Sequence, residues 1–293
     1  MTLEQLRIFV AVAEREHVTR AAQALNVTQS AASGAIAALE TYHDIKLFHR
    51  VGRGIELTEA GRMFLPEARA VLARAASAER VLLEMGGLGR GNLRLVASQT
   101  IAGYWLPERL ARFHQRFPAI ELAVAIANTQ GAANSVLDGS VELGFIEGTI
   151  DEPALAHWKI GTDQMLLVGR EPVDAVTDLW LTQALWVMRE RGSGTRSTFE
   201  AAVRDRGLDP HGLNVALTLP SNEAVLAAVR AGVGYAVLSH LVVAPAVAAG
   251  TLFARPFDLA ERPFFGLRHK ERYRSKAADA LLAVIKDFDT RTG

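Results

Sequence analysis

The 293-residue sequence contains no cysteine. This absence excludes a disulfide framework, a thiolate metal site and a thiol redox sensor. The sequence also has no run of 18 apolar residues, so no membrane span and no membrane partner are expected. Its first residues, MTLEQLRIFV, lack the basic start and small-residue cleavage site of a secretory signal. We therefore expect a cytoplasmic protein.

The sequence has no excess of charge, because 32 Lys and Arg residues balance 32 Asp and Glu residues. The balance holds locally, since residues 1–66 contain seven of each sign. Any nucleic-acid surface must then depend on the placement of single cations rather than on a basic domain. The length, with 49% apolar and 22% charged residues, predicts two or three ordinary globular domains.

Residues 17–40 predict two short helices joined by a tight turn. The first helix is expected from Thr19, as a hydroxyl N-cap, to Leu25. Asn26 stands where the turn needs a residue that tolerates positive φ, and Thr28 can cap the second helix. Small residues that allow the helices to approach closely are Ala21, Ala22 and Ala24. An apolar helix over residues 3–16 is expected to pack behind this pair.

The second helix of this pair has two different faces. Its apolar face is formed by Ala32, Ile36 and Leu39, at helical spacing. Its opposite face carries Gln29, Ser30 and Ser33, which are short polar side chains able to reach base edges. This is the geometry of a helix-turn-helix whose second helix enters a DNA major groove. An ordinary helical hairpin is the alternative that the helix pattern alone leaves open.

Residues 46–62 favour the DNA-binding interpretation. They predict a β-ribbon with Leu47-Phe48 leading out, a turn at Gly52-Arg53-Gly54 and Ile55-Glu56-Leu57 leading back. A two-stranded wing that carries Arg50 and Arg53 can bind phosphates beside the groove.

Residues 1–62 resemble the amino-terminal domain of LysR-type transcriptional regulators. The matching segments are T-R-A-A-Q-A-L at 19–25, V-T-Q-S at 27–30, Ser33 with Leu39-Glu40, L-F-H-R at 47–50 and L-T-E-A-G at 57–61. With this resemblance, the DNA-binding residues are expected to be Arg20, Thr28, Gln29, Ser30, Ser33, Arg50 and Arg53. Many members have Pro, Arg and Gln where this chain has Ser30, Gly34 and Ala35. The operator of a better-known relative therefore cannot be transferred to this chain.

A long helix is predicted after the wing, from Thr58 as cap to about Met85. Its apolar positions follow a 3.5-residue period, which is typical of a helix that pairs with another helix; they are Phe64, Ala68, Val71, Ala75, Ala78, Leu82 and Met85. An amphipathic helix lying on its own domain is the alternative, and Pro66 is expected to bend the first turns. The resemblance implies an antiparallel dimer contact through this linker helix and a homotetramer that binds two DNA half-sites.

Beyond a glycine-rich hinge at residues 87–91, strands and helices alternate, which predicts a parallel sheet covered by helices. The pattern restarts near Thr162. The resemblance implies an α/β effector domain of two lobes, with a periplasmic-binding-protein-like fold. The predicted organisation is a winged helix-turn-helix domain at 1–58, otherwise all α, a linker helix at 59–86, the hinge, and an effector domain at 92–293. Lobe I would comprise 92–162 and 269–293, and lobe II 163–268.

Small polar residues line four strand-to-helix junctions of this domain. In open α/β sheets such junctions bind ligands, and helix amino termini favour anions. We expect a small anionic effector between the lobes, bound by Ser98, Gln99, Thr100, Asn128, Thr129, Arg189, Ser193, Gly194, Thr195 and Ser221. An N-cap role is the alternative at any single junction.

Enzymatic motifs are absent from the sequence. It has no G-x-S-x-G elbow, no P-loop and no histidine pair at metal-binding helical spacing. We expect no catalytic residue, no metal and no cofactor other than the effector. The partners expected are double-stranded DNA and, if the protein activates transcription, RNA polymerase. The alternative is a cytoplasmic solute-binding or enzymatic α/β protein with an unrelated helical extension.

Overall fold

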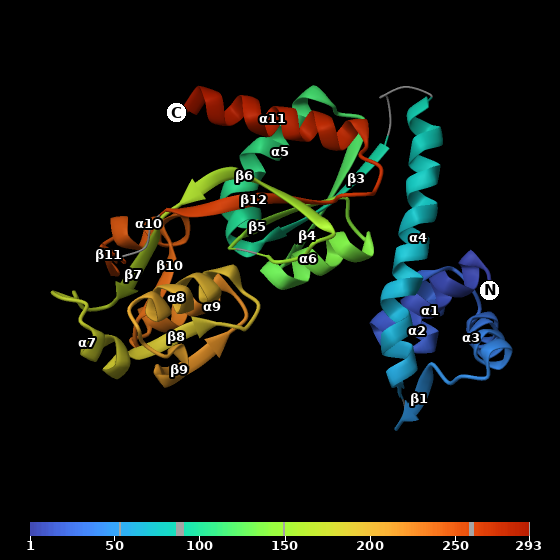
Figure 1. Cartoon of the computed structure of the whole chain (residues 1–293), viewed down its shortest axis with the longest axis horizontal. Coiled ribbons are helices and arrows are strands. Elements are labelled where there is room, and N and C mark those ends of the chain that lie inside the picture. Colours follow the sequence, from blue (N-terminus) through green and yellow to red (C-terminus); the bar gives the residue numbers. More distant parts are fainter. Residues whose placement is uncertain (53, 86–90, 149, 258–260, 293) are drawn as a thin grey trace. The chain divides into compact units, whose positions relative to one another are not determined.

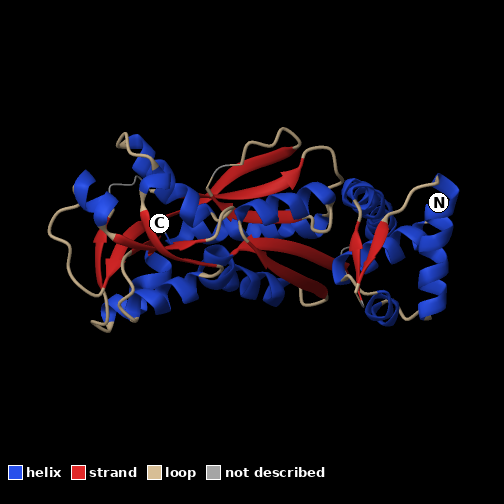
Figure 2. Cartoon of the chain, turned by 90° about the horizontal axis from the view of Figure 1, so that it is seen from below, coloured by secondary structure: helices blue, strands red, loops and turns tan. Residues whose placement is uncertain are grey.

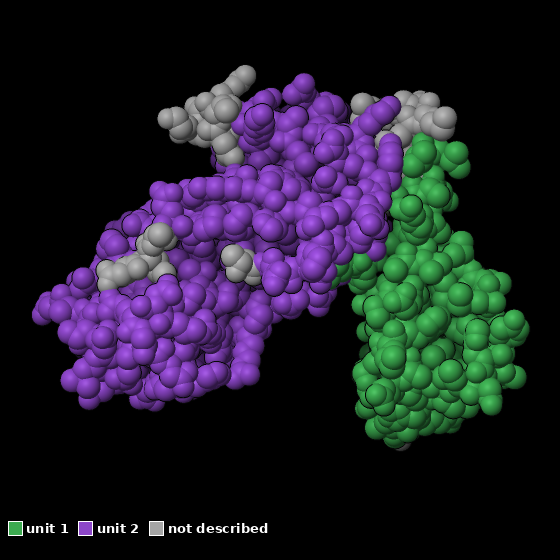
Figure 3. Space-filling model, in the orientation of Figure 1, with its two compact units in different colours: residues 1–86, 137–140 green, residues 87–136, 141–293 purple. Residues whose placement is uncertain are grey.

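The structure is a computed structural model that describes residues 1–52, 54–85, 91–148, 150–257 and 261–292. It divides into two compact units, residues 1–86 with 137–140 and residues 87–136 with 141–293 (Figure 3). Within the described residues, no helix is both long enough and apolar enough to cross a membrane.

The amino-terminal domain consists of three helices and a two-stranded wing. The helices are α1 (Leu3–Arg15), α2 (Val18–Ala24) and α3 (Gln29–His43), and the wing strands are β1 (Phe48–Val51) and β2 (Gly54–Leu57). Figure 2 shows the two short strands of the wing beside the helices of this domain. Aliphatic side chains from all three helices form the core, which includes Ile8, Val12, Ala22 and Ile36. The apolar face predicted for α3 is confirmed, since Ala32, Ile36 and Leu39 are all buried.

The turn of the helix-turn-helix also follows the sequence prediction. Asn26 has φ of 55°, and the Thr28 Oγ1 accepts a hydrogen bond from the backbone N–H of Ala31 at 3.2 Å. The predicted cap of α2 is wrong, because this helix begins one residue earlier. Its N-cap is His17, whose Nδ1 accepts from the Arg20 N–H, and Thr19 lies inside the first turn. Ala24 was expected between the helices, but it lies on the last turn of α2 and is exposed.

The linker helix α4 (Glu59–Met85) is capped by Thr58, whose Oγ1 accepts from the Gly61 N–H at 3.0 Å. The apolar stripe of α4 divides into two parts. Phe64 and Ala68 pack in the core of the DNA-binding domain, so these two positions are not free for a partner helix. Further along, Val71, Ala78 and Leu82 are exposed. Residues 87–90 of the predicted hinge and the side chain of Met85 lie outside the described residues, and Gly91 begins the next strand.

The second unit begins with a five-stranded sheet of order β4-β3-β5-β12-β6. Its strands are β3 (Gly91–Ser98), β4 (Ile120–Ala127), β5 (Leu143–Glu147), β6 (Leu155–Asp163) and β12 (Arg262–His269). The helices around it are η1 (Ile101–Trp105), α5 (Leu106–Arg116), α6 (Thr129–Asp138) and α11 (Lys276–Thr292). Helices α5 and α11 lie together over one face of the sheet (Figure 1). Val136 of α6 packs against the other face, next to Val96 and Gly144. We call this part the first lobe.

The second lobe has two smaller sheets. Strand β7 (Met165–Gly169) lies between β10 (Ala236–Ser239) and β11 (Phe253–Pro256), while β8 (Leu185–Arg189) pairs with β9 (Asn214–Leu219). A bridge between Trp186 and Tyr235 connects the two sheets. The helices are α7 (Asp178–Gln183), α8 (Gly194–Asp205), η2 (Pro210–Gly212), α9 (Asn222–Arg230) and α10 (His240–Ala248). Buried Trp186 packs against Trp180 and Phe199 in its core.

The expectation of a parallel sheet was only partly right. Strand β3 is parallel to β4 and β5, but β12 is antiparallel to both β5 and β6, and β7 is antiparallel to both of its neighbours. Strands β6 and β11 and helices α7 and α10 were not predicted. Only Leu155, Ile160 and Asp163 of the edge strand β6 are buried, and its sequence has no continuous apolar run. Pro245 inside α10 obscures the helical pattern. The exact domain and lobe boundaries stay predictions.

Candidate functional site

The first turn of α3 presents the short polar side chains predicted to contact DNA. Gln29, Ser30 and Ser33 are all exposed. The hydroxyls of Thr28 and Ser30 are 3.0 Å apart, so the residue that caps the helix also orients a neighbouring side chain. Gly34 is exposed as well, with no heavy atom near the position that a Cβ would occupy. This face of α3 therefore offers hydroxyl and amide groups without steric obstruction.

The wing places one of its two predicted arginines on a paired strand. Arg50 lies opposite Ile55 in the β1–β2 ladder and is exposed, as is Arg20 on α2. Arg53 lies outside the described residues. The imidazole Nε2 of His49 is 3.7 Å from the carboxylate of Glu56 on the neighbouring strand. The predicted DNA-binding residues thus come from α2, α3 and the wing of one small domain.

Glu40 holds the wing against the recognition helix α3. Its Oε1 accepts hydrogen bonds from the backbone N–H groups of Leu47 at 2.8 Å and Phe48 at 3.2 Å, and its Oε2 accepts from Lys46 Nζ at 2.7 Å. Burial alone would raise the pKa of the Glu40 carboxyl, but these donors outweigh burial and lower the pKa. The sequence pattern included Glu40 in the Leu39-Glu40 pair without revealing this function.

In the second unit, the structure brings the four predicted junctions together. Gln99, at the end of β3, accepts a hydrogen bond from the Asn222 N–H at 2.9 Å and donates to the Pro220 carbonyl at 3.0 Å. The Asn222 side chain donates to Thr100 Oγ1 at 3.1 Å. Ser221 caps α9 by accepting from the Ala224 N–H, which is the cap role left open in the sequence. These bonds join the two lobes directly.

A second group of contacts joins the lobes beside the first. Asn128, at the end of β4, donates to Glu190 at 3.3 Å, and the Gln130 N–H donates to the Gly192 carbonyl at 3.2 Å. The Gly194 N–H donates to Thr129 Oγ1 at 3.0 Å. A Cβ at Gly194 would lie 2.2 Å from the Glu147 carbonyl oxygen, so only glycine permits this approach.

The predicted cation of the cleft, Arg189, and most of the predicted hydroxyls already have partners. Arg189 is buried and donates to Glu190 and, at 2.6 Å, to Asn222. Burial raises the pKa of Glu190, but Arg189 and Asn128 together lower it further than burial raises it. Thr195 Oγ1 accepts from Arg262 at 3.2 Å. Ser193 is the N-cap residue of α8 and is buried, but its side chain forms no capping hydrogen bond with the described residues.

Sequence reasoning missed the carboxylates and one arginine of this cleft. Glu147 ends β5, and its carboxylate accepts hydrogen bonds from the hydroxyls of Ser98 and Thr100. Arg262 begins β12 and forms an ion pair with Asp163. A signal for Glu147 is present in the sequence, because this residue directly follows the apolar run at residues 143–146. Arg262 and Asp163 could not be found, because they meet only when β12 pairs with β6.

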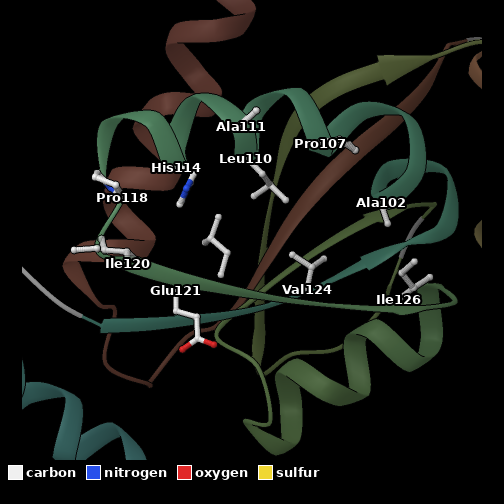
Figure 4. Close-up of a pocket in the computed structure, with 12 residues that line it drawn as sticks. Ala102, Pro107, Leu110, Ala111, His114, Pro118, Ile120, Glu121, Val124 and Ile126 are labelled. Atoms are coloured by element: carbon white, nitrogen blue, oxygen red, sulfur yellow. The ribbon is translucent and has the colours of Figure 1, made fainter.

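Two other observations bear on ligands. A groove of about 850 Å³ lies between α5 and the edge strand β4, and its lining side chains include Leu110, Val124 and Ile126 (Figure 4). None of the predicted effector-binding residues lines it. Across the described residues, no group of three or more His, Asp or Glu side chains is arranged to hold a metal ion.

Comparisons with known proteins agree with this architecture. Residues 3–62 match the family model for the bacterial regulatory helix-turn-helix protein, lysR family, and residues 86–289 match the LysR substrate binding domain. The chain therefore belongs to the LysR family of bacterial transcriptional regulators. The match at residues 3–62 favours a regulator over a solute-binding or enzymatic protein with an unrelated extension.

Relatives and solved structures cover almost the whole chain. An uncharacterized HTH-type transcriptional regulator of Escherichia coli (strain K12), YeiE, is 34% identical over 288 residues, which is 94% of each chain. A probable RuBisCO transcriptional regulator of Nostoc sp. is 30% identical, over 97% of this chain and 87% of that relative. The crystal structure of CbnR, a LysR family transcriptional regulator, superposes with a TM-score of 0.69 at 19% identity, over 98% of this chain and 99% of that chain.

We expect Glu40→Gln to lower the stability of the DNA-binding domain by roughly 1–3 kcal/mol at pH 7, because a buried charge-assisted contact is lost. The lowered pKa means that the carboxylate stabilises the fold above its unfolded pKa and that this contribution disappears as pH falls through the folded pKa. Thermal unfolding of both proteins at pH 7 and pH 4 measures this. Glu67→Gln, at an exposed position, is the control. A difference in stability between the wild type and Glu40→Gln that is equal at both pH values would contradict the role given to the Glu40 carboxylate.

Proposed function

We propose that the protein binds promoter DNA through α3 and the wing, with Gln29, Ser30 and Ser33 at base edges and Arg50, Arg53 and Arg20 at phosphates. Thr28 would bind the DNA backbone and so fix the start of α3 on it. Support comes from the exposure of the polar face of α3 beside a wing that Glu40 holds in place. CbnR, whose full-length structure has been solved in complex with its target DNA, has the same fold with a TM-score of 0.67.

We further propose that a small metabolite with an acidic group controls the protein by binding between the lobes. The observation that carries this proposal is the convergence of the four predicted junctions on one interlobe contact zone. The acidic group would bind at the start of α8, at Ser193, Gly194 and Thr195, where the helix dipole favours negative charge and the Gly194 N–H would exchange Thr129 for the ligand. Arg189 would add positive charge from the adjoining strand. The ligand would compete with hydrogen bonds that now join the lobes.

The exposed apolar surfaces support a homo-oligomer. Val71 and Leu82 are 42% and 70% exposed on α4, as expected for a helix that pairs with the same helix of a second copy. Strands β4 and β9 lie at the edges of their sheets and also expose apolar side chains; these are Val124, Ile126, Val215 and Leu217. The free backbone groups of an exposed edge strand readily pair with another chain, so a partner subunit would protect them. We therefore propose a dimer through α4 and a tetramer through the effector domains.

Gln29→Ala should weaken binding to the cognate promoter by about 1–3 kcal/mol and leave binding to random DNA almost unchanged, because the amide would contact bases. Arg50→Ala should weaken both and reduce the salt slope by about 1, because a phosphate contact is lost. Electrophoretic mobility shift at several salt concentrations measures both effects. Equal loss on cognate and random DNA in Gln29→Ala would contradict its role. Arg53→Ala should behave as Arg50→Ala does.

Replacing both Val71 and Leu82 by Glu should separate the dimer, since each substitution would bury an unpaired charge in the proposed seam. Arg74→Glu is the matched control, because Arg74 is an exposed polar residue of the same helix. Light scattering measures the assembly, and the promoter shift assay measures the loss of avidity that should accompany it. An unchanged assembly with unchanged promoter affinity would show that α4 makes no seam.

Thr195→Val and Thr100→Val should each lower the affinity for an acidic effector by roughly tenfold to a hundredfold, because a hydrogen bond to a charged ligand is worth about 1.5–3 kcal/mol. The ligand is the carboxylate or phosphate that most stabilises the wild type in a thermal-shift screen, and calorimetric titration measures its Kd. Thr198→Val is the control, since its hydroxyl donates to the Gly194 carbonyl within α8. Full affinity in both cleft variants would place the effector elsewhere.

A further inference from the structure

The interlobe zone has three carboxylates but only two guanidinium groups among the described residues. The carboxylates are those of Glu147, Asp163 and Glu190, and the guanidinium groups are those of Arg189 and Arg262. The side chains of Glu147, Asp163, Arg189 and Arg262 are all less than 4% exposed, and that of Glu190 is 28% exposed. A charge at such depth is costly unless an opposite charge accompanies it.

Each guanidinium is already committed to a carboxylate other than Glu147. Arg189 Nε lies 2.8 Å from Glu190 Oε2, and its Nη2 lies 2.9 Å from Glu190 Oε1, which makes the pair bidentate. Arg262 Nη2 donates to Asp163, whose other oxygen accepts from the Ser239 hydroxyl. Asp163 therefore has a close cation and a hydroxyl donor.

Glu147 shares its nearest cation, Arg262, with Asp163, and Asp163 holds the closer contact. Within the described part of the chain, the hydrogen-bond donors to the Glu147 carboxylate are the neutral hydroxyls of Ser98 and Thr100. The nearest guanidinium nitrogen, Arg262 Nη1, lies 3.8 Å from its Oε1, beyond hydrogen-bond distance. Arg262 Nε is also buried and has no hydrogen-bond partner among the described residues. This pair of opposite charges is therefore incompletely satisfied on both sides.

Glu147 lies under the start of α8, in the region proposed for the effector. A Cβ at Gly194 would lie 2.8 Å from Glu147 Cγ, and the Arg262 nitrogen that is closest to Glu147 also donates to Thr195. Gly194 and Thr195 belong to the second lobe, whereas Glu147 ends a strand of the first. Separation of the lobes would therefore expose the Glu147 carboxylate beside the helix terminus that is proposed to bind an acidic group.

We infer that the effector is a zwitterion of the amino-acid class, whose ammonium group pairs with Glu147 while its acidic group binds at the start of α8. This inference rests on the interlobe effector site proposed above and adds a second charge to the ligand. An ammonium group supplies Glu147 with a cation that is not shared with Asp163, and a ligand carboxylate supplies an acceptor to donors of the cleft such as Arg262 Nε. An organic cation fits better than a metal ion, since the described residues place no metal-binding cluster here.

The experiment compares ligands that differ only in the ammonium group. Each L-amino acid that occurs in proteins is tested by thermal unfolding of the full-length protein. Every one that raises the melting temperature is compared with the hydroxy acid of the same side chain, such as L-malate for L-aspartate or L-lactate for L-alanine. We expect at least one amino acid to bind the wild type at least tenfold more tightly than its hydroxy acid, and Glu147→Gln to abolish that preference. Glu171→Gln, an exposed second-lobe carboxylate, is the matched control.

Two outcomes with the wild type alone overturn the inference, so the test does not depend on whether the variants fold. One is that no amino acid raises the melting temperature, and the other is that each hydroxy acid binds as tightly as its amino acid. The unliganded Glu147→Gln gives a further test, because loss of a carboxylate that only shares the Arg262 cation with Asp163 should not lower its melting temperature. A decrease as large as that of Asp163→Asn would show that Glu147 is a structural residue. If hydroxy acids bind the wild type as tightly as their amino acids but do not bind Thr195→Val, the ammonium contact is overturned and the proposed effector site stays intact.

Discussion

The two lobes of the effector domain meet where the backbone at Gly194 lies against the end of β5. A side chain at this position would collide with the Glu147 carbonyl oxygen, so the contact depends on the absence of a Cβ. Because the approach is so close, the Gly194 N–H reaches Thr129 Oγ1, and the hydroxyl of Thr129 in turn donates to the Glu147 carbonyl. Further interlobe bonds, such as those of Gln99, Asn128 and Asn222, form around this point. The cleft is therefore closed by the protein's own polar groups.

A ligand that enters this cleft must compete with the hydrogen bonds between the lobes. A ligand shifts a conformational equilibrium only by the difference between its affinities for the two arrangements. Groups that are hydrogen-bonded across the closed cleft, such as Thr100 and Asn222, would lose those partners when the lobes part. An effector that supplies new partners to them favours the open arrangement. In the proposed mechanism, the chemistry of Glu147 and of the α8 terminus determines which molecules do so.

In the DNA-binding domain, too, a buried polar contact fixes two elements relative to each other, here α3 and the wing. Glu40 on α3 accepts from the first backbone N–H of the wing and from Leu47 just before it. The exposed polar face of α3 and the arginine of the wing are thereby held in a fixed relation. This matters in a domain with no net charge, because affinity for DNA must come from the geometry of a few contacts rather than from a general electrostatic field.

The sequence by itself determined the local features of this protein. Periodicity and caps gave the helix-turn-helix, the position of Asn26 in the turn, the cap at Thr28 and the start of α4, because each depends on residues within a few positions of one another. The motifs also identified the family and the four polar junctions. The antiparallel placement of β12, by contrast, depends on a strand that follows β5 by more than a hundred residues. The pairing of Arg262 with Asp163, and the place of Glu147 beneath Gly194, come with that long-range topology. Local patterns carry no information about such contacts, so only the tertiary structure decided where the charges of the cleft lie.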